Sequence, residues 1–446
     1  MRAAVTETVR LDFQVQPGGS MRGTARVPGD KSISHRAVML GALADGKTIV
    51  SGLLEGEDVL CTVAAFRQMG VAIRGPSAGR VEIDGVGLHG LTAPAQPLDM
   101  GNSGTAMRLM AGILAAQRFD SELIGDASLT RRPMKRVIEP LTAMGANLAS
   151  ADGGRQPLRI SGGKNLHGID YRLPVPSAQV KSSILLAGLY AAGETAVTEP
   201  APTRDHTECM LRAFGYEVAV AGATARLRGG GRLRATTLDV PADISSAAFF
   251  LVGASIAPES DLLLPDVGIN PTRIGVVNIL RLMGADIEIV NARTVGAEPV
   301  GDLRVRYRRL RGIPIPPDQV PLAIDELPAI LIAAACAEGE TVLAGAEELR
   351  VKESDRIAAM AAGLRAVGIE VRETPDGMIV RGGGIRGGVV DSQGDHRIAM
   401  AFAMAGLVAS KPIAIHDCKN VDTSFPGFAK LARAAGLRIE STEAAS

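Results

Sequence analysis

The sequence predicts an α/β protein of two similar domains, each made of three repeated α/β units around buried parallel helices. Three observations support this fold class. A glycine that ends a helix recurs six times along the 446 residues, at intervals of 68–84 residues. An alternating apolar strand follows each of these glycines. A polar helix start, followed by an apolar helix rich in small residues, also recurs six times and in step with the glycines.

The six glycines share one context, a helix before them and a strand after them. Glycine is the residue that adopts the left-handed conformation past a helix end at the least cost. We therefore expect six helix C-termini at these positions, each followed by a strand. The glycines are Gly70, Gly145, Gly215, Gly284, Gly368 and Gly436.

The six apolar helices open on polar residues and continue in Ala, Gly, Leu and Met. A single Asp or Ser at a helix start is an ordinary cap, but six in register indicate a repeated device. A helix N-terminus offers free N–H groups and a partial positive charge, so it also favours an anion. The starts lie at residues 30–32, 101–104, 176–179, 242–245, 324–326 and 394–397.

Six units divide naturally into three plus three, and the chain is long enough for two domains. We expect the first domain to span residues 29–241. The second should span residues 242–446, with residues 1–28 returning to it. A substrate cleft between the domains, lined by helix N-termini, is the expected active site.

The composition excludes several classes of function. The formal net charge is zero, and the chain has no Trp and only 4 Tyr and 9 Phe, which argues against nucleic acid and anionic membranes as partners. The longest apolar runs, such as residues 244–257, are too short to cross a bilayer. Residues 1–16 lack the apolar segment of a signal peptide, so a cytoplasmic location is expected. The Cys and His residues show no metal-ligand spacing, and neither a metal nor a cofactor is expected.

Basic residues gather at the helix starts and in the loops between strands and helices. Arg pairs with phosphate and carboxylate groups through two hydrogen bonds, while Lys acts as a point charge and can exchange a proton. Each of these cations taken alone reads as a solvated surface charge. Together they predict an enzyme that binds two small anionic substrates. The cations at helix starts are Lys31, Arg36, Arg108, Lys181 and Arg397.

Two carboxylates stand within this basic setting. Asp325 begins one of the apolar helices, and Glu353 lies between Lys352 and Arg356. A carboxylate near several cations stays ionised and can accept a proton, whereas burial opposes its ionisation. The alternative interpretations are a helix cap for Asp325 and a surface ion pair for Glu353.

The motifs that carry this chemistry resemble the 5-enolpyruvylshikimate-3-phosphate synthase family, in the same order and over nearly the whole chain. Residues 204–208 and 270–273 look like the second class of that family. The resemblance implies an inside-out α/β barrel fold and transfer of the enolpyruvyl group of phosphoenolpyruvate to the 5-hydroxyl of shikimate 3-phosphate, with release of phosphate. The motifs are residues 29–36 (GDKSISHR), 101–108 (GNSGTAMR), 132–134 (RPM), 177–181 (SAQVK), 350–356 (RVKESDR) and 394–397 (GDHR).

The resemblance also implies roles for individual residues. Asp325 would accept the proton of the attacking hydroxyl, and Glu353, with Lys31, would deliver a proton to the methylene carbon. The residues implied for shikimate 3-phosphate are Lys31, Ser32, Arg36, Ser177, Ala178, Gln179, Arg204, Asp325 and Lys352. Those implied for phosphoenolpyruvate are Lys31, Asn102, Gly104, Arg132, Gln179, Arg356 and Arg397.

The sequence departs from the family pattern in places. Thr423 stands where many members have Lys, so one phosphate contact is missing or comes from Lys419. Leu109 stands where many members have Pro. Gly104 is retained where some herbicide-tolerant members carry Ala, so we expect glyphosate to fit. The chain is expected to act as a monomer.

Three rival functions remain open. The sister transferase that acts on UDP-N-acetylglucosamine shares the fold but uses a Cys in a mobile loop, and the matching residues 125–133 contain no Cys. A non-catalytic repeat scaffold would not need cations and carboxylates at the same end of successive units. An RNA-end-processing enzyme is disfavoured by the zero net charge and the few aromatic residues.

Overall fold

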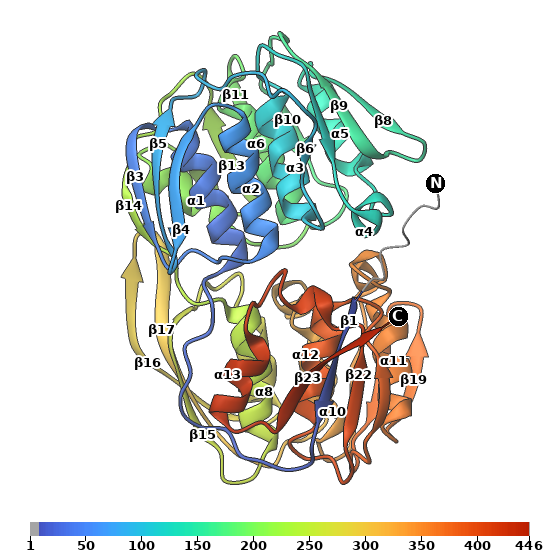
Figure 1. Ribbon diagram of the computed structural model, residues 1–446. Helices are drawn as coiled ribbons and strands as arrows, with labels where there is room; N and C mark the ends of the chain where they lie inside the picture. Colours follow the sequence, from blue (N-terminus) through green and yellow to red (C-terminus); the bar gives the residue numbers. More distant parts are fainter. Residues whose placement is uncertain (1–8, 446) are drawn as a thin grey trace, which may run out of the picture. The chain divides into compact units, whose positions relative to one another are not determined.

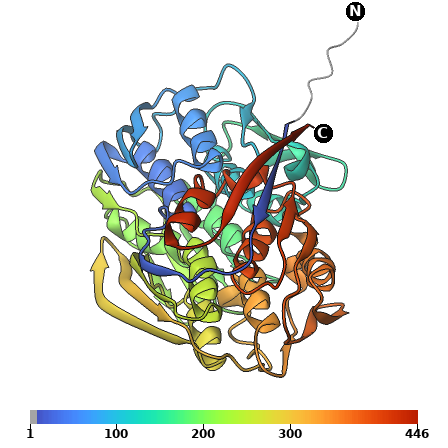
Figure 2. The same ribbon diagram turned by 60° about the horizontal axis from the view of Figure 1, so that its bottom comes forward.

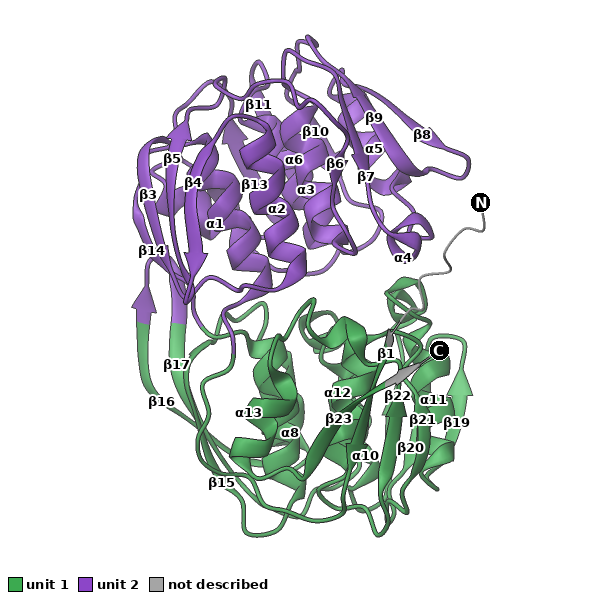
Figure 3. Cartoon of the chain, viewed as in Figure 1, with its two compact units in different colours: residues 1–27, 242–293, 300–446 green, residues 28–241, 294–299 purple. Residues whose placement is uncertain are grey.

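The computed structural model describes residues 9–445. The sequence-based expectation about a signal peptide concerned residues 1–16, and residues 1–8 of this segment lie outside the described residues. The chain divides into two compact units (Figure 3). Unit 1 contains residues 1–27, 242–293 and 300–446, and unit 2 contains residues 28–241 and 294–299. The division differs from the expected domains at residue 28 and in the short segment 294–299, which packs with unit 2. Each unit has its own hydrophobic core.

Unit 2 holds three four-stranded sheets with the same strand order. In each sheet the first two strands are parallel, and the remaining pairs are antiparallel. The sheets are, in order of pairing, β14 (Thr237–Asp239), β3 (Asp45–Ser51), β5 (Arg80–Val86) and β4 (Ala72–Ser77); β6 (Leu98–Asp99), β7 (Ser121–Ile124), β9 (Arg155–Ser161) and β8 (Asn147–Ala151); and β10 (Asp170–Arg172), β11 (Glu194–Thr198), β13 (Thr224–Arg228) and β12 (Ala219–Ala221).

Unit 1 repeats this order, with one sheet reduced to three strands. The tip of the β16–β17 hairpin is the segment that packs with unit 2. The sheets are β2 (Arg22–Thr24), β15 (Asp261–Gly268), β17 (Glu298–Arg306) and β16 (Asp286–Val295); β18 (Glu340–Leu343), β20 (Gly377–Arg381) and β19 (Glu370–Thr374); and β21 (Gly388–Asp391), β22 (Ile413–His416), β1 (Val9–Val15) and β23 (Ile439–Ala445).

The last of these sheets joins the two ends of the described chain. Strand β1 pairs antiparallel with β22 on one side and with β23 on the other (Figure 2). Strand β1 thereby occupies the third position of its sheet, where β5, β9, β13 and β17 stand in the other four-stranded sheets. Strand β1, from the N-terminal segment, thus pairs with two strands from the last part of the chain.

Three buried helices form the centre of each unit (Figure 1). In unit 2 they are α1 (Lys31–Leu43), α3 (Gly104–Leu114) and α6 (Ala178–Gly188), and α3 contacts both of the others. Small residues let these helices approach closely. A Cβ atom added at Gly112 of α3 would lie 2.2 Å from the carbonyl oxygen of Ser183 in α6. In unit 1 the buried helices are α8 (Ile244–Ile256), α10 (Leu327–Ala335) and α12 (His396–Ala405).

Amphipathic helices accompany the sheets and end at the predicted glycines. All six glycines have a positive φ, between +75° and +122°. The prediction of six glycine-terminated helices is confirmed. These helices are α2 (Glu57–Gln68), α5 (Lys135–Ala143), α7 (His206–Ala213), α9 (Gly275–Leu282), α11 (Arg356–Ala366) and α13 (Phe428–Ala435); the remaining short helices are α4 (Ala127–Thr130), η1 (Pro321–Ala323), η2 (Glu347–Val351) and η3 (Lys419–Val421).

Five of the six buried helices carry the predicted side-chain cap. Asp30, Ser103, Ser177, Asp243 and Asp395 each accept a hydrogen bond from a backbone N–H of the first turn. Helix α10 differs, because it begins at Leu327 and has no side-chain cap. The interpretation of Asp325 as a plain helix cap is therefore wrong. No helix in the described part of the chain is long and apolar enough to cross a membrane.

The glycine caps generate a stability prediction. Gly215 has φ +75°, and a Cβ atom there would meet only ordinary contacts, the nearest at 3.7 Å. Gly215→Ala should therefore cost roughly 1 kcal/mol of unfolding free energy through backbone strain alone. Chemical denaturation measures this cost. Gly383→Ala is the control, since Gly383 has open space and no positive φ; equal losses in the two variants would contradict the cap assignment.

Candidate active site

Lys31 is the first residue of α1, directly after the cap Asp30. Its Nζ lies 3.0 Å from Oδ2 of Asp58, near the start of α2, and 18% of the Lys31 side chain is exposed. Asp58 itself is buried. The carboxylate holds the ammonium group in place at the helix N-terminus, where Ser32 follows it. This end of α1 can therefore present a fixed positive charge to an anion.

Arg36, one turn further along α1, is buried and bonded within unit 2. Its Nε donates to Oγ1 of Thr207 at 2.7 Å, and its Nη2 donates to Oγ of Ser182 at 2.7 Å. Its Nη1 donates to the carbonyl oxygen of Ser32 at 2.9 Å. These bonds tie α1 to α6 and α7. The contact of Arg36 with a substrate stays a prediction, whereas its role in joining three helices is visible.

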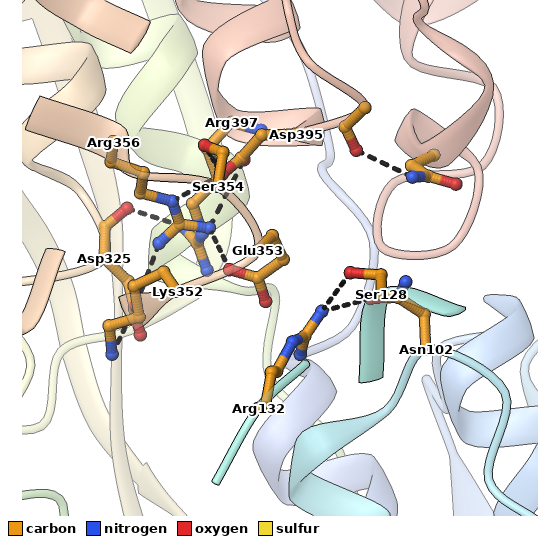
Figure 4. Close-up of polar contacts among 12 residues, drawn as sticks. Asn102, Ser128, Arg132, Asp325, Lys352, Glu353, Ser354, Arg356, Asp395 and Arg397 are labelled. Carbon is orange, nitrogen blue, oxygen red and sulfur yellow. Dashed lines mark hydrogen bonds and ion pairs between the residues drawn. The ribbon is translucent and has the colours of Figure 1, made fainter. Parts of the chain in front are cut away.

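The start of α3 gathers polar groups from the loop around α4. Ser103 caps the helix, and Gly104 is its first residue. Nη2 of Arg132 donates to Oδ1 of Asn102 at 2.5 Å and to Oγ of Ser128 at 3.2 Å (Figure 4). Asn102 in turn donates to Asp126 at 2.6 Å. A guanidinium group is thus held beside the free N–H groups of a helix start.

A second set of bonds joins α3 to α6. Nη1 of Arg108 donates to Oε1 of Gln179 at 2.6 Å, and Nε2 of Gln179 donates to Oγ1 of Thr105 at 2.9 Å. Ser177, the cap of α6, stands two residues before Gln179. The two helix starts that carry Gly104 and Gln179 are therefore linked directly by side chains.

Lys181 is enclosed by carboxylates, so the prediction that it is one of the cations offered to a substrate is not supported by its surroundings. Its Nζ lies 2.8 Å from carboxylate oxygens of both Glu199 and Glu208, and the side chain is 3% exposed. Burial acts to lower the pKa of Lys181, but the two carboxylates outweigh it and raise that pKa. Lys181 holds α6 against α7 and the loop before it. Arg204 lies in that loop and is half-buried.

Arg356, the first residue of α11, is the centre of a charged cluster in unit 1 (Figure 4). Its Nε donates to Asp395 at 2.8 Å, its Nη2 donates to Glu353 at 2.6 Å, and its Nη1 lies 3.4 Å from Oδ1 of Asp325. Only 1% of the Arg356 side chain is exposed. Burial acts to lower the pKa of Arg356, but Asp395 and Glu353 outweigh it and raise that pKa. The Glu353 pair is thus not the surface ion pair considered from the sequence.

Asp325 lies between two cations of this cluster. In addition to Arg356, Nζ of Lys352 lies 3.5 Å from its Oδ1, and the Asp325 side chain is 12% exposed. Lys352 also contacts Glu348 at 2.8 Å. Oδ1 of Asp325 thus lies near two cations, and its side chain still reaches solvent.

Arg397 and Asp395 belong to the start of α12. Nη1 of Arg397 donates to the backbone carbonyl of Asp325 at 2.8 Å, which links α12 to the segment before α10. Burial, together with Arg356, lowers the pKa of Arg397. Burial acts to raise the pKa of Asp395, but the Arg356 guanidinium outweighs it and holds that pKa below its usual value.

A second buried group lies beside this cluster. Nη2 of Arg273 donates to Oγ of Ser245 at 2.6 Å and lies 3.4 Å from Oε1 of Glu326. Ser245 also donates to Glu326, and Arg397 lies 3.9 Å from the same carboxylate. Arg273, the last residue of the segment 270–273, is therefore buried and bonded among helix starts.

Thr423, which stands where Lys is common, serves a local role. It is buried, and its hydroxyl donates to the carbonyl oxygen of Asn420 at 2.7 Å. The Asn420 amide donates to the carbonyl oxygen of Gly394, just before α12. Lys419, considered as a replacement for the missing Lys, is exposed in η3.

Sequence reasoning placed the polar helix starts correctly but missed the residues that hold them. Asp58, Glu326 and His35 were not singled out, although each lies within or beside a quoted motif or polar loop. A carboxylate at or near a helix start, such as Asp58 or Glu326, gave no signal of its partner elsewhere in the chain. Within residues 9–445, no three His, Cys, Asp or Glu side chains are grouped so as to hold a metal ion.

The fold and the charged helix starts define a class of α/β proteins with cations gathered at the N-termini of buried helices. Comparison with known proteins identifies the class further. The family model of EPSP synthase (3-phosphoshikimate 1-carboxyvinyltransferase) matches residues 15–431. The chain belongs to the EPSP synthase family.

Relatives and solved structures agree with this family over nearly the full length. The chain is 67% identical to the 3-phosphoshikimate 1-carboxyvinyltransferase of Methylococcus capsulatus, over 96% of this chain and 98% of the relative. It is 65% identical to that of Alkalilimnicola ehrlichii, over 97% and 98%. A structure of EPSP synthase from Acinetobacter baumannii superimposes with a TM-score of 0.88 at 57% identity, covering 97% of this chain and all of that one. The predicted family, enzyme class and α/β fold are confirmed.

His35 in α1 generates a pH prediction. It is fully buried, and burial, with Lys31 and Arg36 nearby, lowers its pKa from 6.5 to about 3. Between these two pH values the unfolded chain binds a proton that the folded chain does not. The contribution of neutral His35 to the free energy of unfolding is therefore present above pH 6.5 and is lost as the pH falls towards 3. The contribution of His35 should decrease by roughly 2 kcal/mol between pH 7 and pH 5.

The variant His35→Gln isolates this contribution, because it removes the titrating group. Denaturation curves of both proteins at pH 7, 6 and 5 should show a smaller pH-dependent loss in the variant. The same loss in both proteins would show that His35 is protonated in the folded state as readily as in the unfolded one.

Proposed function

We propose that the chain transfers the enolpyruvyl group of phosphoenolpyruvate to the 5-hydroxyl of shikimate 3-phosphate and releases phosphate. Membership of the EPSP synthase family supports this reaction. The observation that carries the catalytic part is the position of Asp325 beside Lys352 and Arg356. A carboxylate held in place beside two cations is suited to take the proton of a hydroxyl nucleophile.

Shikimate 3-phosphate is proposed to bind at the starts of α1 and α6. Ser177 caps α6, and the free N–H groups of its first turn suit a phosphate. Lys31 adds a positive charge held by Asp58. The full set proposed for this substrate is Lys31, Ser32, Arg36, Ser177, Ala178, Gln179, Arg204, Asp325 and Lys352.

Phosphoenolpyruvate carries a carboxylate and a phosphate, and each suits a guanidinium group. We propose that Arg132 with Asn102 and Gly104 receives one of them, and that Arg356 and Arg397 receive the other, with Lys31 and Gln179 contacting the same substrate. Arg356 already pairs with three carboxylates. Among these Glu353 is 23% exposed, against 12% for Asp325 and 0% for Asp395. The substrate is therefore proposed to displace Glu353.

The displaced Glu353 then has a chemical task. As the 5-oxygen bonds to the substituted carbon of phosphoenolpyruvate, the methylene carbon must gain a proton and become a methyl group. We propose that Glu353, which takes up a proton once it has left Arg356, supplies this proton together with Lys31, while Asp325 takes the hydroxyl proton. Loss of phosphate together with one methyl proton then restores the vinyl group. Exclusion of water would favour each proton transfer.

Three further points stay predictions. They are the monomeric state, the cytoplasmic location and inhibition by glyphosate. The sister activity with UDP-N-acetylglucosamine is an outcome that the first experiment distinguishes.

The role of Asp325 predicts the effect of Asp325→Asn. Because the amide cannot accept the hydroxyl proton, kcat should fall by roughly 10²–10⁴-fold while binding of both substrates is kept. Release of phosphate from phosphoenolpyruvate, with and without shikimate 3-phosphate, measures kcat. Calorimetric titration with shikimate 3-phosphate measures binding.

Glu348→Gln is the matched control, since Glu348 contacts the other side of Lys352. Its kcat should stay within about twofold of wild type. A fall as large as that of Asp325→Asn would mean that both residues act only by holding Lys352. Phosphate release that requires UDP-N-acetylglucosamine instead would overturn the proposed reaction.

Gly104 predicts how the phosphoenolpyruvate site responds to crowding. A Cβ atom added there would lie 2.7 Å from Nη1 of Arg108 and 3.2 Å from Nη1 of Arg132. Gly104→Ala should raise KM for phosphoenolpyruvate severalfold and the inhibition constant of glyphosate by roughly tenfold or more, because the inhibitor is longer. Competition assays measure both constants. A wild-type enzyme that glyphosate does not inhibit would refute the expected fit.

A further inference from the structure

A chain of buried polar side chains links three helices of unit 2 and ends at the turn of residues 102–104, which contains Asn102 and Gly104. Nδ1 of His35 in α1 lies 2.8 Å from Oγ1 of Thr62 in α2, and Nε2 of His35 lies 3.3 Å from Oγ of Ser103, the cap of α3. His35 and Thr62 are 0% exposed, and Ser103 is 1% exposed. None of the three is assigned to a substrate.

The hydrogen bonds of this chain agree with one neutral form of the imidazole. Oγ of Ser103 accepts the backbone N–H of Ala106 at 3.1 Å, so its own hydrogen is free to point at Nε2 of His35. Nε2 then accepts, and Nδ1–H donates to Thr62. Burial and the nearby Lys31 and Arg36 disfavour the charged form of His35, which fits this arrangement.

The chain fixes a turn that the proposed function uses. Ser103 stands between Asn102, which accepts from Arg132, and Gly104, the first residue of α3. At the other end, His35 lies one helical turn after Lys31 on α1. A displacement of the Ser103 side chain would therefore shift residues 102–104 relative to Lys31.

We propose that His35 is a positioning residue for phosphoenolpyruvate: through Ser103 it holds the turn at residues 102–104 in register with Lys31. The proposal rests on the proposed function. His35 touches no reacting atom, and its contribution is specific to one of the two substrates. Loss of the Ser103 bond should weaken phosphoenolpyruvate binding, whereas loss of the Thr62 bond should not.

Two substitutions separate these bonds. In His35→Asn the amide occupies the place of Nδ1 and reaches Thr62 but not Ser103, while in His35→Gln the amide occupies the place of Nε2 and reaches Ser103. Both remove the ring and the titrating group, so a purely structural role predicts similar kinetics. We expect KM for phosphoenolpyruvate to rise roughly tenfold in His35→Asn and less than threefold in His35→Gln, with KM for shikimate 3-phosphate unchanged in both.

A readout independent of activity accompanies the kinetics. Hydrogen exchange of the peptide that contains residues 102–107 should be faster in His35→Asn than in His35→Gln, since the cap on Ala106 is loosened. If His35→Asn folds poorly, Ser103→Ala replaces it: this variant deletes the same bond together with the α3 cap, so it should raise KM for phosphoenolpyruvate at least as much. Thr62→Val, which deletes the other bond, should behave as wild type towards phosphoenolpyruvate.

The outcomes distinguish this proposal from the proposed function. A wild-type protein that releases no phosphate with both substrates would overturn the function and the proposal with it. An active wild type in which the Asn and Gln variants raise KM for both substrates equally, or lose only stability, would overturn the positioning role alone.

Discussion

The buried helix N-terminus is the constraint on which the rest of the structure depends. The first turn of a helix has N–H groups without partners inside the helix, and they are costly to bury. Five of the six central helices meet this cost with an Asp or Ser side chain on the preceding residue. The N–H groups that remain, with the dipole of the helix, favour an anion. The same requirement that stabilises the core thus creates the sites proposed for the substrates.

Charge balance decides how cations can be kept at these helix ends. A buried guanidinium group is stable only when carboxylates surround it with good geometry. Arg356 meets this condition through Asp395, Glu353 and Asp325, and Lys181 meets it through Glu199 and Glu208. The two cases differ in exposure. The carboxylates around Lys181 are nearly closed off, whereas Glu353 is partly exposed, which supports the proposal that a substrate displaces Glu353 from Arg356.

The sequence predicted the repeated parts of the fold well because they depend on local chemistry. A glycine at a helix end and an Asp or Ser at a helix start act on their immediate neighbours, so Gly215 or Ser177 can be interpreted without tertiary structure. The surroundings of Asp325 before α10 were harder to predict from the sequence, because Lys352 and Arg356, which contact this residue, come from later segments of the chain. Lys181 was misplaced for the same reason. Its two carboxylates lie 18 and 27 residues further along the chain, where no local pattern marks them.

The sheet that contains β1 has a consequence for the order in which the chain acquires its structure. The continuous segment 28–241 supplies three sheets of unit 2 without any strand from elsewhere. Unit 1 needs β1 near one end of the described chain and β23 near the other, and these strands pair along their whole length. During synthesis, unit 2 can form most of its core before the strands that pair with β1 have been made. The pairing of β1 with β23 closes the longest loop of the described chain, so we expect it to be the slowest. This pairing completes unit 1, which carries Asp325.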